Sequence, residues 1–158
     1  MSVGWTEVIV DLSFEQLDLL VVASRLVCPA TGLDGPGVVG VRDGLIEFVE
    51  MGDGGSEYQA ARETLEVEDG ILLPGLIDLH AHPAASGSKF GIDADRDLLP
   101  KGSTTVLSQG DAGARNVDQY ISETIAGSRT TVKLALNFCA EGESNPAGRF
   151  FSLDEANI

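Results

Sequence analysis

The only two histidines of this 158-residue chain, His80 and His82, are separated by a single residue. The apolar run that starts at Ile71 leads into them, and it predicts a strand buried on both faces, as in a parallel sheet with helices outside. Residues i and i+2 of a strand point to the same face, so both imidazoles should project together. Two neutral imidazoles at a strand end make half of a site for Zn²⁺ or a similar divalent ion. The alternative interpretation is two polar residues at a strand end.

The segment before the pair, Pro74-Gly75-Leu76-Ile77-Asp78, makes the motif far more specific. It resembles the approach to the first barrel strand in the amidohydrolase superfamily. The similarity is closest to the dihydroorotase and N-acyl-D-amino-acid deacylase members and to related acyl-ester hydrolases. It extends from about Asp18 to the C-terminus and also rests on residues 18–22, 29–32, 43–44 and 102–106.

The resemblance implies an α/β fold, namely the N-terminal part of a TIM-like (β/α)₈ barrel preceded by strands of a small β-sandwich. We assign residues 1–17 to an N-terminal extension, 18–72 to the sandwich and 73–158 to about three βα units of the barrel. A whole barrel needs about 250 residues, and an open part would expose strand edges and apolar faces to water. We therefore expect a second chain, or a missing segment beyond Ile158, to complete the barrel.

Apolar patterning and turn residues predict the individual elements. Before the motif we expect a strand at 19–27, a turn at 34–37, a hairpin of 38–42 and 45–50 around Asp43-Gly44, and short strands at 64–67 and 71–73. After it we expect a short acidic helix with solvent-facing aspartates at 93–100, strands at 104–108 and 131–138, and an amphipathic helix at 117–128. The core face of that helix should contain Val117, Tyr120, Ile121, Thr124 and Ile125.

Two further segments carry open interpretations. The small-residue loop 83–91 follows the histidines at the end of the strand where barrel active sites lie, so it either lines a pocket or only connects two elements. A capping box at 152–155 predicts the start of another helix.

Asp111 follows the predicted second barrel strand and is the next candidate for the site. Related deacylases have a cysteine metal ligand at what looks like this position, and aspartate can bind a divalent ion through oxygen. A turn or helix cap is the competing interpretation of Asp111. Arg115, in a segment similar to the ester hydrolases, would orient an anionic substrate or bridge loops. Gln109 and Asn137, near strand ends, are candidates for substrate contact, with surface roles as the alternative.

The resemblance implies a divalent metal cofactor, Zn²⁺, as one or two ions. The implied reaction is hydrolysis of an amide, cyclic amide or ester bond of a small molecule by metal-activated water. A catalytic zinc needs at least three protein ligands, and His80 and His82 supply two. Further ligands and the general base, an aspartate of the final strand, are expected outside this chain, so no catalytic residue is assigned within it. The alternatives are a non-catalytic binding module or a structural partner that keeps the hydrolase scaffold.

The charge, cysteine content and apolar runs of the sequence limit the classes of partner and the cellular location that we expect. The formal net charge of −15 disfavours binding to nucleic acid or anionic membranes and is typical of a solvated acidic surface. Cys28 and Cys139 lie far apart without metal-type spacing, so we expect reduced core thiols in a cytoplasmic protein. We find neither a run of about 18 apolar residues nor the basic start of a signal peptide. The expected partners are a second polypeptide, within a higher oligomer, and a small-molecule substrate.

Overall fold

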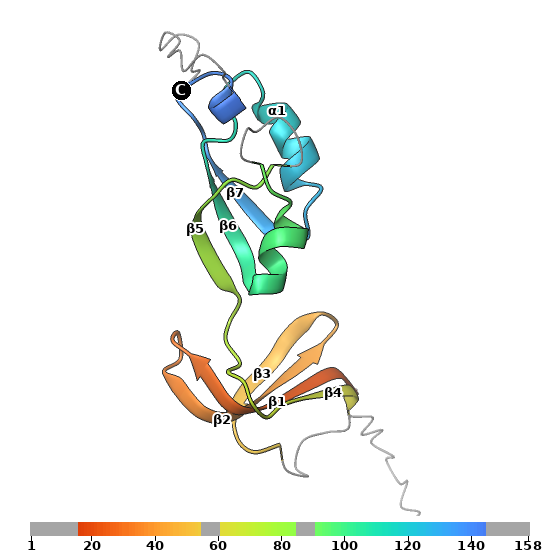
Figure 1. The fold of residues 1–158 in the computed structure, drawn as a ribbon. Helices are drawn as coiled ribbons and strands as arrows, with labels where there is room; N and C mark the ends of the chain where they lie inside the picture. The colour runs from red at the N-terminus through yellow and green to blue at the C-terminus, as the bar shows by residue number, and fades with distance from the viewer. Residues whose placement is uncertain (1–15, 55–60, 85–90, 145–158) are drawn as a thin grey trace, which may run out of the picture. The chain divides into compact units, whose positions relative to one another are not determined.

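The computed structural model describes residues 16–54, 61–84 and 91–144 (Figure 1). The chain divides into two compact units, residues 1–74 and residues 75–158. In the part of each unit that the structure describes there is one β-sheet, of four strands in the first and three in the second, and helices accompany the second sheet. The protein is therefore α/β. The predicted extension before residue 16, most of the loop 83–91 and the capping box at 152–155 lie outside the described residues.

The first unit is a mixed sheet with the strand order β3-β2-β1-β4. β1 pairs antiparallel with β2 and parallel with β4, and β2 pairs antiparallel with β3. Leu17, Leu20 and Val38 form its buried cluster. The strands are β1 (Leu17–Cys28), β2 (Leu33–Arg42), β3 (Leu45–Met51) and β4 (Ala61–Val67).

The turns of this sheet match the sequence prediction at one hairpin and not at the other. Asp43 and Gly44 join β2 to β3 with φ values of 50° and 74°, which confirms the predicted hairpin. The predicted turn at 34–37 is wrong, because these residues lie in β2 and the chain reverses at residues 29–32. Cross-strand pairing explains the difference: Asp34 lies opposite Val27 and also accepts two hydrogen bonds from Arg25, at 2.9 and 3.1 Å.

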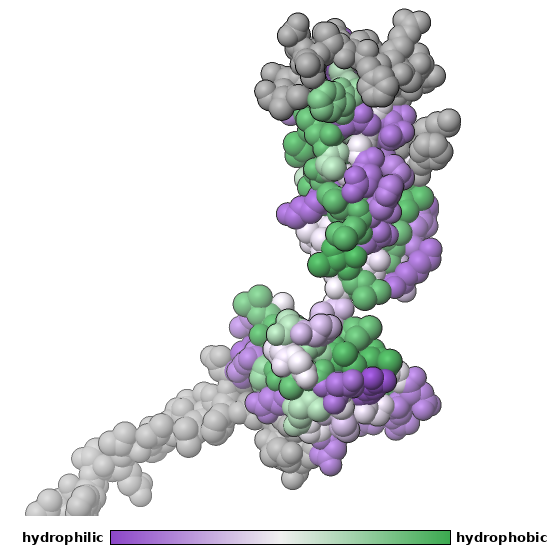
Figure 2. Space-filling view, turned by 90° about the vertical axis from the view of Figure 1, so that its left-hand side faces the viewer, coloured by the Kyte–Doolittle hydropathy of each residue, from purple (hydrophilic) through white to green (hydrophobic). Residues whose placement is uncertain are grey.

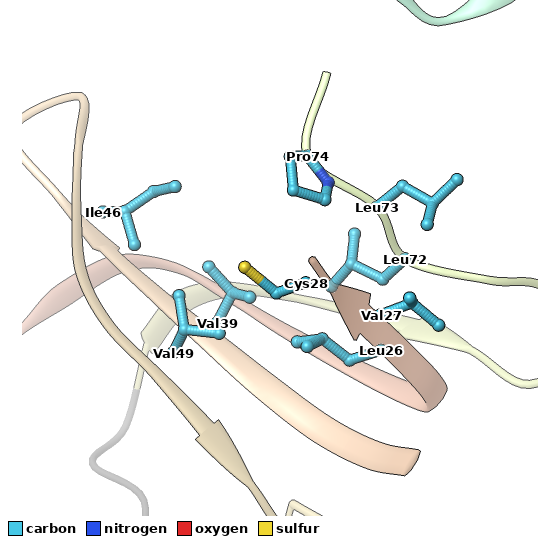
Figure 3. A pocket seen from close by; sticks show the side chains of 9 residues that line it. All are labelled: Leu26, Val27, Cys28, Val39, Ile46, Val49, Leu72, Leu73 and Pro74. Carbon is cyan, nitrogen blue, oxygen red and sulfur yellow. The ribbon is translucent and has the colours of Figure 1, made fainter. Parts of the chain in front are cut away.

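The predicted short strand at 71–73 is reduced to one residue. Leu72 forms an isolated parallel bridge with Leu26, accepting from the Val27 N–H and donating to the Arg25 carbonyl, each at 2.9 Å. A cavity of about 180 Å³ lies beside this bridge (Figure 3). Its lining is apolar apart from one thiol and contains no histidine or carboxylate, so it is not the candidate site. The lining residues are Leu26, Val27, Cys28, Val39, Ile46, Val49, Leu72, Leu73 and Pro74.

The second unit is a parallel sheet with the strand order β5-β6-β7. Helical turns pack on one face of the sheet (Figure 1), where they share a buried cluster with β6 and β7 that includes Val106, Val132 and Tyr120. Its elements are β5 (Leu76–Ala81), η1 (Ala94–Leu98), η2 (Leu99–Lys101), β6 (Ser103–Gln109), α1 (Val117–Tyr120), η3 (Ile121–Ile125), β7 (Thr131–Ala135) and η4 (Gly142–Ser144).

Strand β5 is not buried on both faces, contrary to the sequence prediction. Its apolar side chains are largely accessible: Leu76 is 49% exposed, Ile77 65% and Leu79 67%. Figure 2 views the side of the molecule on which β5 lies and shows apolar surface there. Among the described residues β5 pairs only with β6, so it is an edge strand. Central β6 is different, since Val106 and Ser108 are both fully buried.

The helices of the second unit follow the predicted pattern with local exceptions. The expected helix at 117–128 is present as α1 and η3 and ends at Ile125. Tyr120 and Thr124 are buried as expected, but Ile121 is 46% exposed because it faces away from the cluster shared with β6. The strand expected at 131–138 ends at Ala135.

The acidic segment 93–100 is helical, and its aspartates do more than face solvent. Asp93 caps η1 by accepting from the backbone N–H groups of Asp95 and Arg96, each at 3.0 Å. Asp95 accepts from the N–H groups of Arg129 and Thr130, at 2.8 and 2.7 Å, just before β7. Proline 100 does not end the helical segment but lies inside η2.

The remaining composition-based predictions can be compared with the described residues. Cys28 and Cys139 are both thiols rather than parts of a disulfide, as predicted; Cys139 is buried and Cys28 half-buried. Within the described part of the chain, no helix has the length and apolar character needed to cross a bilayer.

Candidate metal centre

The two histidines lie next to one another at the C-terminal end of β5. His80 belongs to the strand and His82 follows it directly. Their ring centroids are 5.5 Å apart and the ring planes meet at 70°, in an edge-to-face arrangement. The His80 N–H donates to Asp78 Oδ1 at 3.0 Å, which steadies the backbone between the strand and the rings. Strand alternation therefore brings both imidazoles to one place.

His82 is held by a buried carboxylate from the neighbouring strand end. Its Nδ1 lies 3.1 Å from Oδ1 of Asp111, whose side chain is completely buried. The second oxygen, Oδ2, accepts a hydrogen bond of 2.5 Å from Ser108 Oγ. Gly110 precedes Asp111 with a φ of 84°, which turns the chain at the end of β6. Asp111 is thus buried beside His82 and does not lie on the surface.

A tyrosine from the covering helix fixes the backbone beside His82. Tyr120 is 5% exposed, and its hydroxyl donates to the carbonyl of Pro83. Burial raises the pKa of Tyr120 to about 12; the hydrogen bond with Ser108 acts in the opposite direction, and the charge of Asp111 adds to the rise. The phenol therefore remains a protonated donor at neutral pH. The helical spacing predicted Tyr120 only as a core residue, although a buried tyrosine hydroxyl regularly needs a polar partner.

The histidine pair fits the nitrogen ligands of a divalent ion. Zn–N bonds are about 2.0–2.1 Å long, so two imidazoles on one tetrahedral ion have centroids about 5 Å apart, close to the 5.5 Å between His80 and His82. A third ligand does not come from the described residues, because residues 16–54, 61–84 and 91–144 hold no group of three or more His, Cys, Asp or Glu side chains that could bind a metal. These residues therefore supply an incomplete ligand set.

Gln109 and Asn137 lie at the ends of the neighbouring strands, where their side chains bond to backbone groups. Gln109 Nε2 donates to the carbonyl of Leu79 at 2.8 Å, across from β6 to β5. Asn137 Nδ2 donates to the carbonyl of Gly110 at 3.0 Å, and its Oδ1 accepts from the N–H of Cys139 at 2.8 Å. Both amides thus connect the segments around the site, and their contact with a substrate stays a prediction.

Arg115 lies in the loop that follows Asp111. It forms an exposed ion pair with Glu141 at 3.3 Å, and its backbone N–H donates to the carbonyl of Ala140 at 2.8 Å. These contacts agree with the loop-bridging alternative. A role for Arg115 in binding an anionic substrate stays a prediction.

Known proteins are similar to this chain in sequence and in fold. The chain is 30% identical over 98 residues to a dihydroorotase of Chlorobaculum tepidum and 31% identical over 90 residues to a deacetylase of Agrobacterium fabrum. These matches cover 61% and 56% of this chain. The fold matches the crystal structures of a dihydroorotase, with a TM-score of 0.70 and 24% identity, and of an adenine deaminase, with 0.63 and 25%. These relatives and structures indicate the amidohydrolase superfamily.

The similarity concerns the N-terminal portion of such amidohydrolases. The chain spans only about a fifth of the length of the two curated relatives, at 21% and 22%. The alignments with the two structures cover 89% and 82% of this chain, and 38% and 33% of the dihydroorotase and the adenine deaminase. No protein-family model matches the chain.

Proposed function

We propose that this amidohydrolase chain carries the first two metal ligands, His80 and His82, of a metal-dependent hydrolase that cleaves an amide, cyclic amide or ester bond. The observation that carries the proposal is the pair of neighbouring imidazoles at the C-terminal end of a parallel strand, where barrel enzymes place their active sites. The dihydroorotase and the deacetylase among its relatives support a hydrolytic reaction.

The residues of this chain would bind and orient. His80 and His82 would each bind a divalent ion, Zn²⁺ first among the candidates, through a ring nitrogen. Such an ion, once bound, polarises the substrate carbonyl and makes water a better nucleophile at neutral pH. Gln109 and Asn137 hold the loops around the histidines. The general base would come from a strand outside residues 1–158.

The rest of the barrel would come from a second polypeptide or from a segment beyond Ile158. β5 offers an unpaired edge within the described sheet, and Leu76, Ile77 and Leu79 expose apolar side chains along it. Parallel sheets are normally covered on both faces, because their strands are apolar on both. The described residues contain no group of three possible metal ligands, which also supports a contribution from outside them. A chain with the remaining barrel strands would cover these side chains and complete the metal site.

Metal content tests this proposal. The full chain would be isolated with a histidine-free affinity tag, since the sequence itself contains just two histidines. Native mass spectrometry and elemental analysis of the isolated complex should report Zn²⁺ together with a polypeptide of the amidohydrolase type. Hydrolysis would be assayed on an N-acyl amino acid, a cyclic amide and an acyl ester.

The variants His80→Ala and His82→Ala should each lose the metal and the hydrolysis. Gln119→Ala is the matched control, because Gln119 is exposed on α1 and hydrogen-bonds Glu123 on the helix surface. A metal-free complex that contains the complete barrel would contradict the proposal and favour a structural partner.

A further inference from the structure

We propose that Asp111 is a positioning residue and not a metal ligand: it holds His82 in the tautomer with the proton on Nδ1, so that Nε2 is the nitrogen offered to the ion. This inference rests on the proposed function, and it assigns the role of a side chain for which sequence analysis left metal contact, substrate contact and a turn cap open.

The hydrogen-bond pattern determines the tautomer. An aspartate carboxylate only accepts hydrogen bonds. Oδ1 of Asp111 lies 3.1 Å from Nδ1 of His82, so a neutral His82 must donate from Nδ1. A neutral imidazole carries one proton, and Nε2 is then left with its lone pair. Carboxylates that accept from the distal nitrogen of a metal-bound histidine are a common way to orient the ring and to increase its basicity.

The position of Asp111 argues against direct ligation. Nδ1 and Nε2 lie on different edges of the ring, so an ion on Nε2 would be on the side of His82 away from the carboxylate. Both carboxylate oxygens already have partners, Oδ1 with His82 and Oδ2 with Ser108 Oγ at 2.5 Å. The Asp111 side chain has no exposed area, whereas that of His82 is 27% exposed and His80 is open to solvent. Asp111 would have to leave its buried position to reach a shared ion.

The backbone on both sides of this contact is fixed, so the contact is a stable feature of the fold. On the Asp111 side, Asn137 donates from its amide Nδ2 to the Gly110 carbonyl at 3.0 Å and from its backbone N–H to the Ala112 carbonyl at 2.8 Å. On the His82 side, the buried Tyr120 hydroxyl donates to the carbonyl of Pro83. The carboxylate and the ring are each anchored beside the bond that joins them.

Imidazole nitrogen NMR tests the tautomer directly. Long-range proton–nitrogen correlations of the ¹⁵N-labelled full chain at pH 8, without metal, distinguish a proton on Nδ1 from a proton on Nε2, and His80 serves as the internal reference. We expect His82 to carry its proton on Nδ1. A proton on Nε2 of His82 in the wild-type chain would overturn the inference.

Variants then connect the tautomer to metal binding. Asp111→Asn can either accept from or donate to Nδ1, so we expect a mixture of His82 tautomers and a Zn²⁺ affinity about 10–100-fold lower in competition with a chelator. Asp118→Asn removes the same charge from an exposed site on α1 and should change neither. Ser108→Ala is the second variant, for use if Asp111→Asn fails to fold; it should keep the proton on Nδ1 and lower the Zn²⁺ affinity to a smaller extent.

Two outcomes separate this inference from the proposed function. A wild-type chain with the proton on Nδ1 of His82 but with no Zn²⁺ binding, alone or in its complex, supports the tautomer and contradicts the metal-dependent hydrolase. The second outcome is that Asp111→Asn keeps the His82 tautomer of the wild type but loses Zn²⁺ binding, and that Zn²⁺ shifts the carboxylate carbon resonance of Asp111 in the wild type. This outcome would show that Asp111 is a metal ligand, so it would overturn the inference and leave the proposed function intact.

Discussion

The two sheets of this protein are assembled by different means. In the first unit β1, β2 and β3 follow one another through short reversals, and the Asp43-Gly44 turn joins two of them. In the second unit every neighbouring pair is parallel, so each connection must travel back along the sheet through helical segments. Local turn chemistry can specify the first arrangement, whereas the second depends on contacts between residues far apart in sequence.

Those distant contacts gather around the candidate site. The loops after β5, β6 and β7 are joined by the Asp111–His82 contact, by the Tyr120 hydroxyl on Pro83 and by Asn137 on Gly110. The same side chains that hold the parallel strands together therefore orient the histidines. The contacts that hold the second unit together are thus also those that surround the candidate site, while the described residues of the first unit contain no such cluster.

The largest expected loss of stability comes from Gly113→Ala, because the backbone of Gly113 lies very close to the backbone of Cys139 and Ala140 in the second unit. A Cβ there would lie 1.9 Å from the Cys139 oxygen and 2.5 Å from the Ala140 carbonyl carbon, so the backbone would have to move. We expect a loss of about 3 kcal/mol in the free energy of unfolding, read from hydrogen exchange of the β6 amides. Gly44→Ala in the first unit is the control: its Cβ meets nothing within 4 Å, so only the φ of 74° matters, at a cost of about 1 kcal/mol. Equal losses would contradict the contrast between the units.

The next effect compares two adjacent strands of the second unit. Val106→Ala on β6 removes two methyl groups from a site with no exposed area and should cost about 2 kcal/mol. Ile77→Ala on β5, where the side chain is 65% exposed, should cost less than about 0.5 kcal/mol in the isolated chain. Urea unfolding followed by circular dichroism measures both. If Ile77→Ala lowers the free energy of unfolding of the isolated chain by as much as Val106→Ala, the Ile77 side chain is buried and the contrast between the strands is wrong.

A smaller, pH-dependent effect is expected from Asp95→Asn. The pKa of Asp95 is lowered mainly by the hydrogen bond from the Arg129 N–H, and further by those from the Thr130 N–H and hydroxyl. A lowered folded-state pKa contributes stability above the unfolded value of about 3.9, and this contribution is lost as pH falls further through the folded value. Asp95→Asn should therefore destabilise the second unit at pH 7, and the difference from wild type should shrink as pH falls below about 3.9. Urea midpoints across pH 7 to 3 measure this; a constant difference would exclude the linkage.

The smallest effect should come from Asp34→Asn in the first unit. The Arg25 hydrogen bond lowers the pKa of Asp34 as well, but both side chains are more than half exposed, at 53% and 55%. Solvent and salt screen such a pair, so we expect a change in the urea midpoint smaller than that of Asp95→Asn, and one that fades in 0.5 M salt. An effect larger than that of Asp95→Asn would reverse the proposed order.

Sequence reasoning predicted the elements that depend on local patterns. The Asp43-Gly44 hairpin, the strands on either side of it and the adjacent histidine rings all follow from turn preferences or from strand alternation. Two predictions were wrong. Residues 34–37 have the composition of a turn but lie in β2 and pair with β1, and the apolar run of β5 predicted burial but is largely exposed. In both cases the outcome depends on which other strand is present, a property that no local pattern contains.

By itself, the sequence determined that His80 and His82 lie together, because strand periodicity places them on one face, and the Pro-Gly-Leu-Ile-Asp segment before them resembles the amidohydrolases. Only the tertiary structure decided that Asp111 contacts His82. It lies 29 residues from His82, and the two meet because β5 and β6 pair in parallel and end at the same edge of the sheet. Contacts between residues so distant in sequence depend on strand pairing and burial, which act through the folded chain as a whole.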